Sequence, residues 1–242
     1  MTARSRKRAA IARTCHECPG CGTNSWVTES AYWDEYYSHG RPDIEEPSSF
    51  ARHCRARVAS DQLLFELGCG NGRDALFFAH QGLNVIACDQ SAVAIAKLDA
   101  RPDLSRFRHR PSFITADFAA LPQQHRGEVD FVYSRFSMHA TTAATASAAL
   151  AWTAASLRPG ATLLLEARSV RGSLYGCGLA VAGERDAFIH DGHYRRFLRS
   201  EELSAELTSL GLTIDELVEA DGLAMFRDDD PVVIRVVATR GQ

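Results

Sequence analysis

The sequence predicts an α/β fold in which a doubly wound, mostly parallel seven-stranded sheet ends in one antiparallel strand. From residue 63 onward, short and nearly continuous apolar runs alternate with helical patterns, which is typical of parallel strands buried on both faces. A glycine-rich turn follows the first of these runs. The last two runs have no helical pattern between them, so we expect a hairpin and an antiparallel final strand.

The individual elements follow from these patterns. The expected strands are residues 63–67, 84–88, 112–116, 131–133, 162–166, 213–219 and 232–238, and the expected helices between them are residues 73–81, 92–98, 143–157 and 200–210. Ser200 and Gly211 stand where they would cap the last helix, and residues 228–231 (Asp-Asp-Asp-Pro) suit the hairpin turn. Residues 48–59 are expected to form an amphipathic helix. An aromatic-rich helix over residues 30–41 suits either a lid over a pocket mouth or the packing of Trp33 and Tyr36 into a core.

Composition limits the function classes. The chain has 242 residues, 45% of them hydrophobic and 24% charged, which is enough for one large globular domain. A net charge of −3 argues against a surface-wide nucleic-acid interface. No apolar run approaches the roughly 18 residues of a membrane span, and the basic N-terminus lacks the apolar core of a secretory signal. Two of the seven cysteines, Cys69 and Cys88, fall on central strands, which indicates reduced thiols in the cytoplasm.

Residues 1–29 are predicted to form a basic arm that precedes a domain of residues 30–242. The first fourteen residues carry five basic side chains and no acid, which indicates a solvated, disordered tail or, alternatively, an RNA-contacting one. Cys15, Cys18 and Cys21 have a spacing that can hold zinc. A separate second C-x-x-C pair, which a four-ligand site would need, is absent from the sequence, so free thiols in the arm are the favoured interpretation.

The glycine turn, Glu66-Leu67-Gly68-Cys69-Gly70-Asn71-Gly72, is the main functional motif. Glycine permits unusual dihedral angles and lets the backbone approach a ligand closely. The dinucleotide fingerprint G-x-G-x-x-G would need its third glycine at position 73, where Arg73 stands. The spacing therefore argues against a nicotinamide-dependent oxidoreductase.

Acidic residues follow the next two expected strands. Asp89 stands about twenty residues beyond the turn, where a carboxylate can accept hydrogen bonds from both ribose hydroxyls. Alternatively, Asp89 caps the following helix beside Ser91. Asp117 and Phe118 follow the third strand, where an acid can bind an adenine amino group and an aromatic ring can cover the base.

These residues, with the turn Leu157-Arg158-Pro159-Gly160, resemble the ordered motifs of class I S-adenosylmethionine-dependent methyltransferases over roughly residues 60–240. The segment Gly70-Asn71-Gly72-Arg73-Asp74, with residues 77–79 (Phe-Phe-Ala) and Asp89-Gln90-Ser91, is similar to small-molecule methyltransferases of the tellurite-resistance and thiopurine type. The resemblance implies a Rossmann-like fold and S-adenosylmethionine as cofactor. It assigns the following residues to the cofactor: Glu66, Gly68, Cys69, Gly70, Gly72, Asp89, Gln90, Asp117, Phe118 and Ser134.

Two further segments are candidates for acceptor chemistry. Residues 134–139 follow the fourth strand, where open parallel sheets bind ligands, and His139 is the candidate general base; a surface or helix-capping histidine is the alternative. This segment lacks the Asn/Asp-Pro-Pro-Tyr/Phe motif of nucleobase N-methyltransferases. Residues 168–199 are too long for a routine turn and suggest a lid-like insertion. Within it, Arg168, His193 and Arg196 are expected to bind an anionic acceptor, unless they form salt bridges to the acids Glu166, Glu184 and Asp186.

The sequence thus predicts a cytoplasmic methyltransferase that acts on oxygen or nitrogen of a small, anionic metabolite or natural-product intermediate. A thiol or metalloid methyltransferase is the first alternative. An RNA methyltransferase that uses the basic arm and a zinc knuckle is the second. A relative that binds the cofactor without turnover is the third. The sequence does not indicate an oligomeric state.

Overall fold

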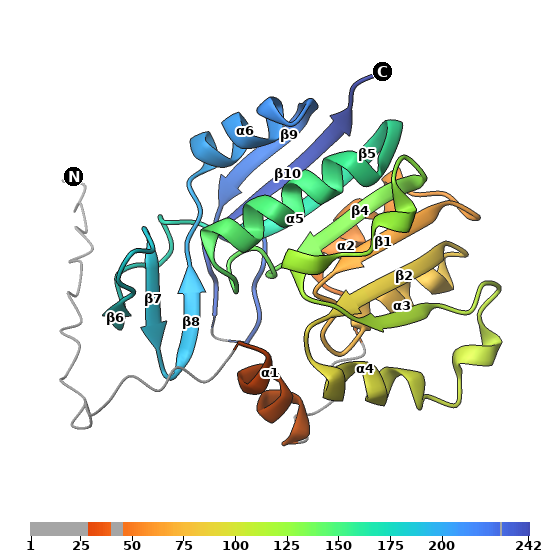
Figure 1. Ribbon diagram of the computed structural model, residues 1–242, viewed down its shortest axis with the longest axis horizontal. Helices are drawn as coiled ribbons and strands as arrows, with labels where there is room; N and C mark the ends of the chain where they lie inside the picture. The colour runs from red at the N-terminus through yellow and green to blue at the C-terminus, as the bar shows by residue number, and fades with distance from the viewer. Residues whose placement is uncertain (1–28, 40–45, 228) are drawn as a thin grey trace, which may run out of the picture.

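The computed structural model describes residues 29–39, 46–227 and 229–242, and its centre is a seven-stranded sheet (Figure 1). The strand order is β3-β2-β1-β4-β5-β10-β9. β10 runs antiparallel to both β5 and β9, whereas the other described pairs are parallel. The predicted fold class is therefore confirmed, including the antiparallel last strand. The strands are β1 (Leu63–Leu67), β2 (Asn84–Asp89), β3 (Ser112–Thr115), β4 (Val129–Arg135), β5 (Leu157–Arg168), β9 (Leu212–Ala220) and β10 (Val233–Arg240).

Helices cover both faces of this sheet, and the central strands supply side chains to both. The helices are α1 (Glu29–Ser38), α2 (Ser49–Cys54), α3 (Arg73–His80), α4 (Ala92–Asp99), α5 (Ala143–Ser156) and α6 (Ser200–Ser209). Leu64 belongs to a core cluster with residues of α2, α3 and α4, whereas its neighbour Phe65 belongs to a second cluster with residues of α5 and α6. Burial on both faces explains why the strands are nearly continuous apolar runs.

Side-chain caps begin three of the helices. Ser48, Ser91 and Thr142 each accept a hydrogen bond from a backbone N–H of the first turn, of α2, α4 and α5 respectively, which satisfies one of the otherwise unpaired donors. The expected cap at Ser200 is not formed. The cap position of α6 is Arg199, and the Ser200 hydroxyl donates to Glu219 at 2.9 Å instead.

Two expected boundaries differ from the structure. The helix expected over residues 48–59 is shorter, because α2 ends at Cys54 and a 3-10 turn, η1 (Arg55–Arg57), follows it; similar turns are η2 (Leu104–Arg106), η3 (Phe118–Ala120) and η4 (Gln123–His125). The expected turn at residues 157–160 is part of β5. Leu157 already pairs with Val129, the register shifts beyond that pair, and Gly160 has a φ of 78°, so the strand begins with a bulge.

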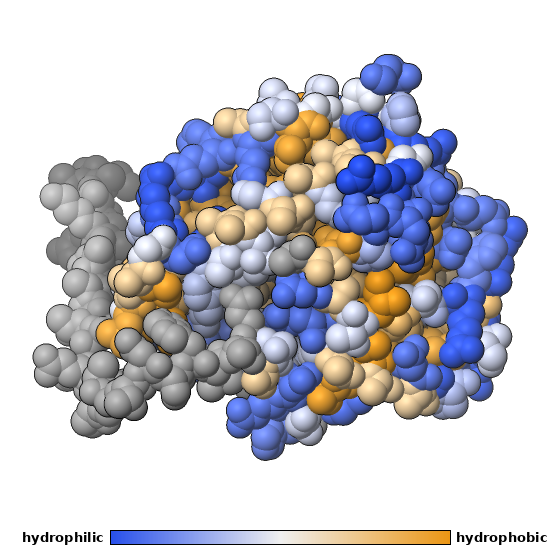
Figure 2. Space-filling view, in the orientation of Figure 1, coloured by the Kyte–Doolittle hydropathy of each residue, from blue (hydrophilic) through white to orange (hydrophobic). Residues whose placement is uncertain are grey.

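The segment of residues 168–199, for which a lid is predicted, contains a second, antiparallel sheet of order β6-β7-β8. β6 (Leu179–Ala180), β7 (Ala187–His190) and β8 (His193–Arg196) lie beside the edge toward which β4 points, with α1 below that edge (Figure 1). The small sheet exposes apolar surface (Figure 2), and Leu179 is 65% exposed. These strands were not predicted, because they are short and β8 has the polar sequence His-Tyr-Arg-Arg.

The predicted arm of residues 1–28, with Cys15, Cys18 and Cys21, lies outside the described residues. Within the part of the chain that is described, no three His, Cys, Asp or Glu side chains gather as a metal site. The four cysteines of that part are free thiols. None of its helices is long and apolar enough to cross a membrane.

Candidate active site

The glycine turn brings bare backbone to the carboxyl edge of the sheet. Gly68, Gly70 and Gly72 have φ angles of 75°, 54° and 75°, a region that side-chain-bearing residues seldom adopt. A Cβ at Gly68 would collide with the Ser137 hydroxyl, and one at Gly70 would collide with the Tyr37 hydroxyl. Both glycines are therefore required by close neighbours as well as by their own conformation.

Asp89 ends β2 beside this turn and holds it in place. Its carboxylate accepts hydrogen bonds from the backbone N–H groups of Gly70, at 2.8 Å, and Ser91, at 2.9 Å. Burial raises the pKa of Asp89, and these two hydrogen bonds oppose that shift. The two interpretations of Asp89 are compatible, since each carboxylate oxygen still has a second lone pair for a ligand hydroxyl.

Two buried polar atoms lie at the carboxyl ends of the neighbouring strands. The described residues offer no hydrogen-bond partner to Oε2 of Glu66 or to Oγ of Ser134, although both residues are buried. Burial, with Asp74 and Asp89 nearby, raises the pKa of Glu66. Unpaired buried polar atoms cost about 1–3 kcal/mol each. Groups of this kind are expected where a polar ligand binds.

Helix α1 lies over the glycine turn as a cover. Asp34 accepts hydrogen bonds from Oγ of Ser91, at 2.7 Å, and from the N–H of Val93, at 3.2 Å, at the start of α4. Lys97 donates to the carbonyl of Tyr37, whose hydroxyl reaches the turn. Trp33 and Tyr36 are only partly buried and belong to neither core cluster, which argues against the core-packing interpretation, and the lid stays a prediction. Asp34 and Tyr37 were not predicted as site residues, although the aromatic density of the helix indicated such a cover.

His139 lies in the loop that follows β4. The hydroxyl of Ser137 donates to the carbonyl of Leu67 at 2.7 Å and ties this loop to the end of β1. The side chain of His139 is buried, and no described residue is a hydrogen-bond partner of its Nδ1. Burial lowers the pKa of His139, and the nearby cations Arg168 and Arg195 lower it further. The imidazole is therefore neutral at pH 7, with a nitrogen available to accept a proton.

Strand alternation divides the basic residues of β8 into two sets. His193 and Arg195 lie near His139 and Arg168. Arg196 donates to backbone carbonyls of the His139 loop, at 3.2 Å to Met138 and 3.4 Å to Thr141. The guanidinium of Arg196 therefore supports the loop rather than joining the basic group. Arg195, and not Arg196, lies near His139 and Arg168. The two-residue period of a strand would have indicated this difference if β8 had been predicted.

The acids weighed as partners for these basic residues have other partners. Glu166 pairs with Arg135 and Arg235, Asp186 pairs with Arg199, and Glu184 accepts from the N–H at the start of α5. Arg168 pairs instead with Asp229, at 2.7 Å.

Stability should respond to pH through His193. Burial, Arg195 and Arg168 lower the pKa of His193 from 6.5 to about 3. Above pH 6.5 the imidazole of His193 is neutral in both the folded and the unfolded protein. Between pH 6.5 and about 3 only the unfolded protein binds the proton. The free energy of unfolding therefore falls by about 1.4 kcal/mol for each pH unit of acidification. We expect His193→Phe to remove this part of the slope in urea denaturation from pH 7 to 4. The same replacement at exposed His80 is the control, and an unchanged slope in the His193 variant would contradict the assignment.

Comparisons with known proteins agree with this geometry. Residues 64–160 match the family described as a methyltransferase domain. A SAM-dependent methyltransferase from Methanosarcina mazei is 19% identical, with a TM-score of 0.67 over 78% of this chain and 97% of that chain. The 1,6-didemethyltoxoflavin-N1-methyltransferase of Burkholderia thailandensis, solved with its namesake compound and S-adenosylhomocysteine, is 16% identical, with a TM-score of 0.67 over 94% of both chains. CcbJ methyltransferase from Streptomyces caelestis is 17% identical, with a TM-score of 0.66 over 89% of this chain and all of that one. No curated protein matches the sequence.

Residues 64–160 thus form a methyltransferase domain. The residues at the carboxyl edge of the sheet fit S-adenosylmethionine, because its methionine moiety carries an amino group that suits the unpaired Glu66 oxygen. The turn at Gly68 to Gly72 leaves bare backbone beside it. Asp117 is exposed, whereas Phe118 is buried and would approach a Cβ on Gly68 to 3.4 Å. Gln90 is half-buried directly after Asp89.

Two cavities lie beside this edge, the first of them bordered by Asn71 of the glycine turn. One, of about 390 Å³, lies against α3 and is lined by Arg73, Phe77 and Phe107 among others. The other, of about 410 Å³, lies between α5, α6 and the insertion, and includes Met138 and Arg196. The second cavity thus lies behind the His139 loop, on the side of β8 opposite His193 and Arg195.

Proposed function

We propose that this methyltransferase transfers a methyl group to oxygen or nitrogen of a small, anionic acceptor. The observation that carries the proposal is the surrounding of His139. A buried imidazole with an available Nδ1 lies near the arginines Arg135, Arg168 and Arg195, in the loop whose Ser137 meets Gly68 of the glycine turn. Such a group of guanidinium ions suits a carboxylate or phosphate, and the neutral imidazole suits a general base.

The cofactor would be held by the residues at the carboxyl edge. Glu66 and the backbone of the glycine turn would bind its methionine part, Asp89 with Gln90 its ribose, Asp117 with Phe118 its adenine, and Ser134 would lie near the acceptor. When bound, S-adenosylmethionine supplies a methyl group on a sulfonium, whose departure leaves a neutral thioether. The chain's own task is to hold the acceptor atom in line with that methyl group, since positioning can account for about 7–11 kcal/mol of a barrier in favourable cases.

His139 would take the proton of the acceptor. Nδ1 of His139 would accept the proton of the acceptor O–H or N–H while the bound cofactor supplies the methyl group to that oxygen or nitrogen. The imidazole becomes positively charged in this step. An anionic group on the acceptor would compensate that charge among the surrounding arginines, which is a physical reason for an anionic substrate.

Loss of the base should be seen in turnover and not in cofactor binding. We expect His139→Asn to lower kcat by about 10²–10⁴-fold, the usual contribution of a positioned base, because asparagine retains a polar group but cannot hold the proton. Initial rates with a labelled methyl donor measure kcat, and calorimetric titration with S-adenosylhomocysteine measures the cofactor affinity. Wild-type kcat in the variant would exclude His139 as the base.

The acceptor class is tested by labelling fractionated small metabolites with the radioactive methyl donor, with and without ribonuclease. Label in small anionic compounds supports the proposal. Label confined to ribonuclease-sensitive material would favour an RNA methyltransferase, and label on thiols or metalloids would favour the other alternative. Absence of any labelled small product would overturn the proposal.

A further inference from the structure

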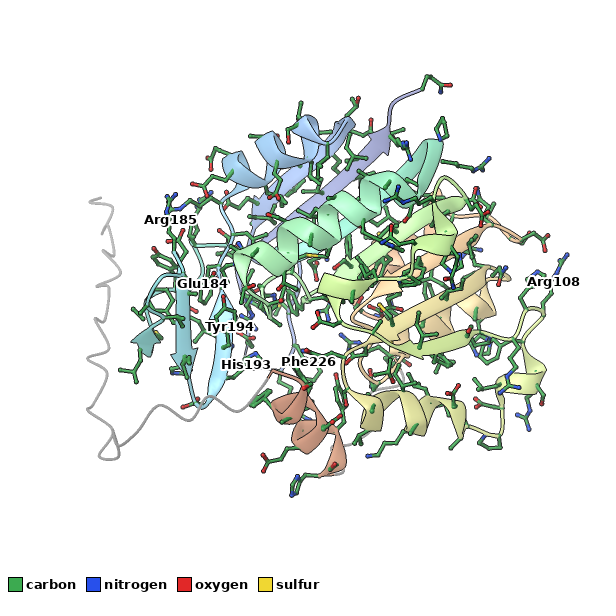
Figure 3. All side chains as sticks on the ribbon, in the orientation of Figure 1. Arg108, Glu184, Arg185, His193, Tyr194 and Phe226 are labelled. Atoms are coloured by element: carbon green, nitrogen blue, oxygen red, sulfur yellow. The ribbon has the colours of Figure 1, made fainter. Side chains whose placement is uncertain are left out.

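The wall of the acceptor site is aromatic as well as basic. The ring of Tyr32 on α1 lies 4.7 Å from that of His193 on β8, at an angle of 30°, and Trp33 meets His193 edge-on at 5.1 Å. Figure 3 shows His193 at the end of the small sheet that lies near α1. Because His193 is neutral at pH 7, it adds a flat ring to this wall and no charge. Helix α1 therefore takes part in both halves of the site.

A second aromatic surface lies in the loop that follows β4. The ring of Phe136 lies 5.2 Å from that of His139, and the guanidinium groups of Arg135 and Arg168 lie 4.2 and 5.2 Å from its centre. Flat side chains thus lie on both sides of the basic group, with Tyr32 and Trp33 of α1 against His193 on β8, and Phe136 against His139. Surfaces of this kind favour a planar ring, since stacked and edge-on aromatic pairs contribute about 0.5–1.5 kcal/mol beyond burial.

One cation of this site, Arg195, forms no ion pair within the described part of the chain, and Asp191 and Asp229 act on it only from a greater distance. Arg135 pairs with Glu166, and Arg168 pairs with Asp229. Among the described residues, no carboxylate lies within ion-pair distance of Arg195, whose side chain is only partly exposed and donates to the carbonyl of His190 at 3.2 Å. A single carboxylate on a ligand would give Arg195 an ion-pair partner, as Glu166 does for Arg135 and Asp229 does for Arg168.

We propose that the acceptor is a planar aromatic acid, with its ring against the Tyr32–His193 wall and its carboxylate on Arg195. The proposal rests on the methyl-transfer function above and narrows its substrate class. The bound carboxylate also affects His139, since neutralising Arg195 removes one of the cations that lower the pKa of the imidazole. Arg195 is thus a binding residue that makes the base stronger only when the acceptor is present.

The test compares three matched groups of acceptors under one assay. Hydroxybenzoates and aminobenzoates carry both features, their carboxamides lack the charge, and aliphatic hydroxy acids lack the ring. We expect methylation of the first group only. Equal rates with carboxamides would overturn the role of the charge, and equal rates with aliphatic acids would overturn the role of the ring. Either result leaves the proposed function intact, whereas label in no small molecule would reject that function itself.

Variants then assign the two features to their residues. Arg195→Gln should raise KM for the aromatic acid about 10- to 100-fold, as expected for the loss of a charged hydrogen bond, and Arg195→Lys should recover part of the affinity. Tyr32→Leu should raise KM about 3- to 10-fold, whereas Tyr32→Phe keeps the ring and should not. Arg185→Gln is the control, because Arg185 lies at the opposite end of the small sheet (Figure 3) and pairs with Glu202. An unchanged KM in Arg195→Gln would contradict the assignment.

Discussion

Replacement of Gly68 by alanine is expected to lower the affinity for S-adenosylhomocysteine by about 30- to 4,000-fold. Two costs add at this position. A φ of 75° is unfavourable for alanine by about 1–2 kcal/mol, and the added methyl would collide with the side chain of Ser137, for which overpacking costs about 1–3 kcal/mol. Because Ser137 ties the His139 loop to β1, relief of the collision must displace either the turn or that loop. Each 1.4 kcal/mol corresponds to a factor of ten.

A matched control separates the two costs. Gly127 has a similar φ of 69°, but nothing lies within 4 Å of a Cβ built there. Gly127→Ala therefore carries the backbone cost alone, and it should lower stability slightly and leave cofactor affinity unchanged. Calorimetric titration and urea denaturation of both variants measure affinity and stability. Equal affinities in the two variants would show that the close approach at Gly68 does not matter for binding.

The sequence predicted those features that depend on neighbours along the chain. Continuous apolar runs identified the strands because both faces of the sheet are covered, and the glycine turn at Gly68 was identified because its backbone needs glycine locally. The antiparallel β10 followed from the absence of a helix before it. Each of these signals lies within a few residues of the feature that it predicts.

Features that depend on distant partners were missed or misassigned. Arg196 was chosen over Arg195 because the strand period of β8 is not visible in four polar residues. Asp34 was not considered, since its partners at the start of α4 lie 57 and 59 residues further along the chain. The expected cap at Ser200 fails for the same reason, because Glu219 on β9 takes its hydroxyl. Such choices are made by tertiary packing and not by local propensity.

Glu166 shows the same dependence on register, with a large energetic consequence. Arg135 on β4, Glu166 on β5 and Arg235 on β10 stand directly opposite one another across three strands. The buried carboxylate of Glu166 accepts from Nε of Arg135 at 2.9 Å and from Nε of Arg235 at 2.7 Å. The backbone carbonyl of Glu166 also accepts from the N–H of Phe136, at 2.9 Å, and Phe136 begins the loop that carries His139. One residue therefore connects the core to the proposed base.

Glu166→Ala is expected to lower the free energy of unfolding by about 3–5 kcal/mol, because it leaves two largely buried guanidinium groups without their counterion. Glu166→Gln keeps the shape and one acceptor, so its loss should be smaller and the variant should remain folded. The exposed pair of Glu46 and Arg52, with side chains 82% and 55% exposed, provides the control, and Glu46→Ala should change stability little. Urea denaturation of the three variants measures the free energy of unfolding. Equal losses of stability in Glu166→Ala and Glu46→Ala would contradict the structure.

The folded Glu166→Gln variant also tests the connection to catalysis. When the charge of Glu166 is lost, no carboxylate holds Arg135 in place. The guanidinium of Arg135 lies over Phe136, at the start of the His139 loop. We expect kcat to fall while the affinity for S-adenosylhomocysteine stays unchanged, since the glycine turn is on a different strand. Loss of stability without loss of kcat would mean that Glu166 supports the sheet alone. Loss of kcat with normal cofactor affinity would mean that Glu166 positions the acceptor half of the site through Arg135.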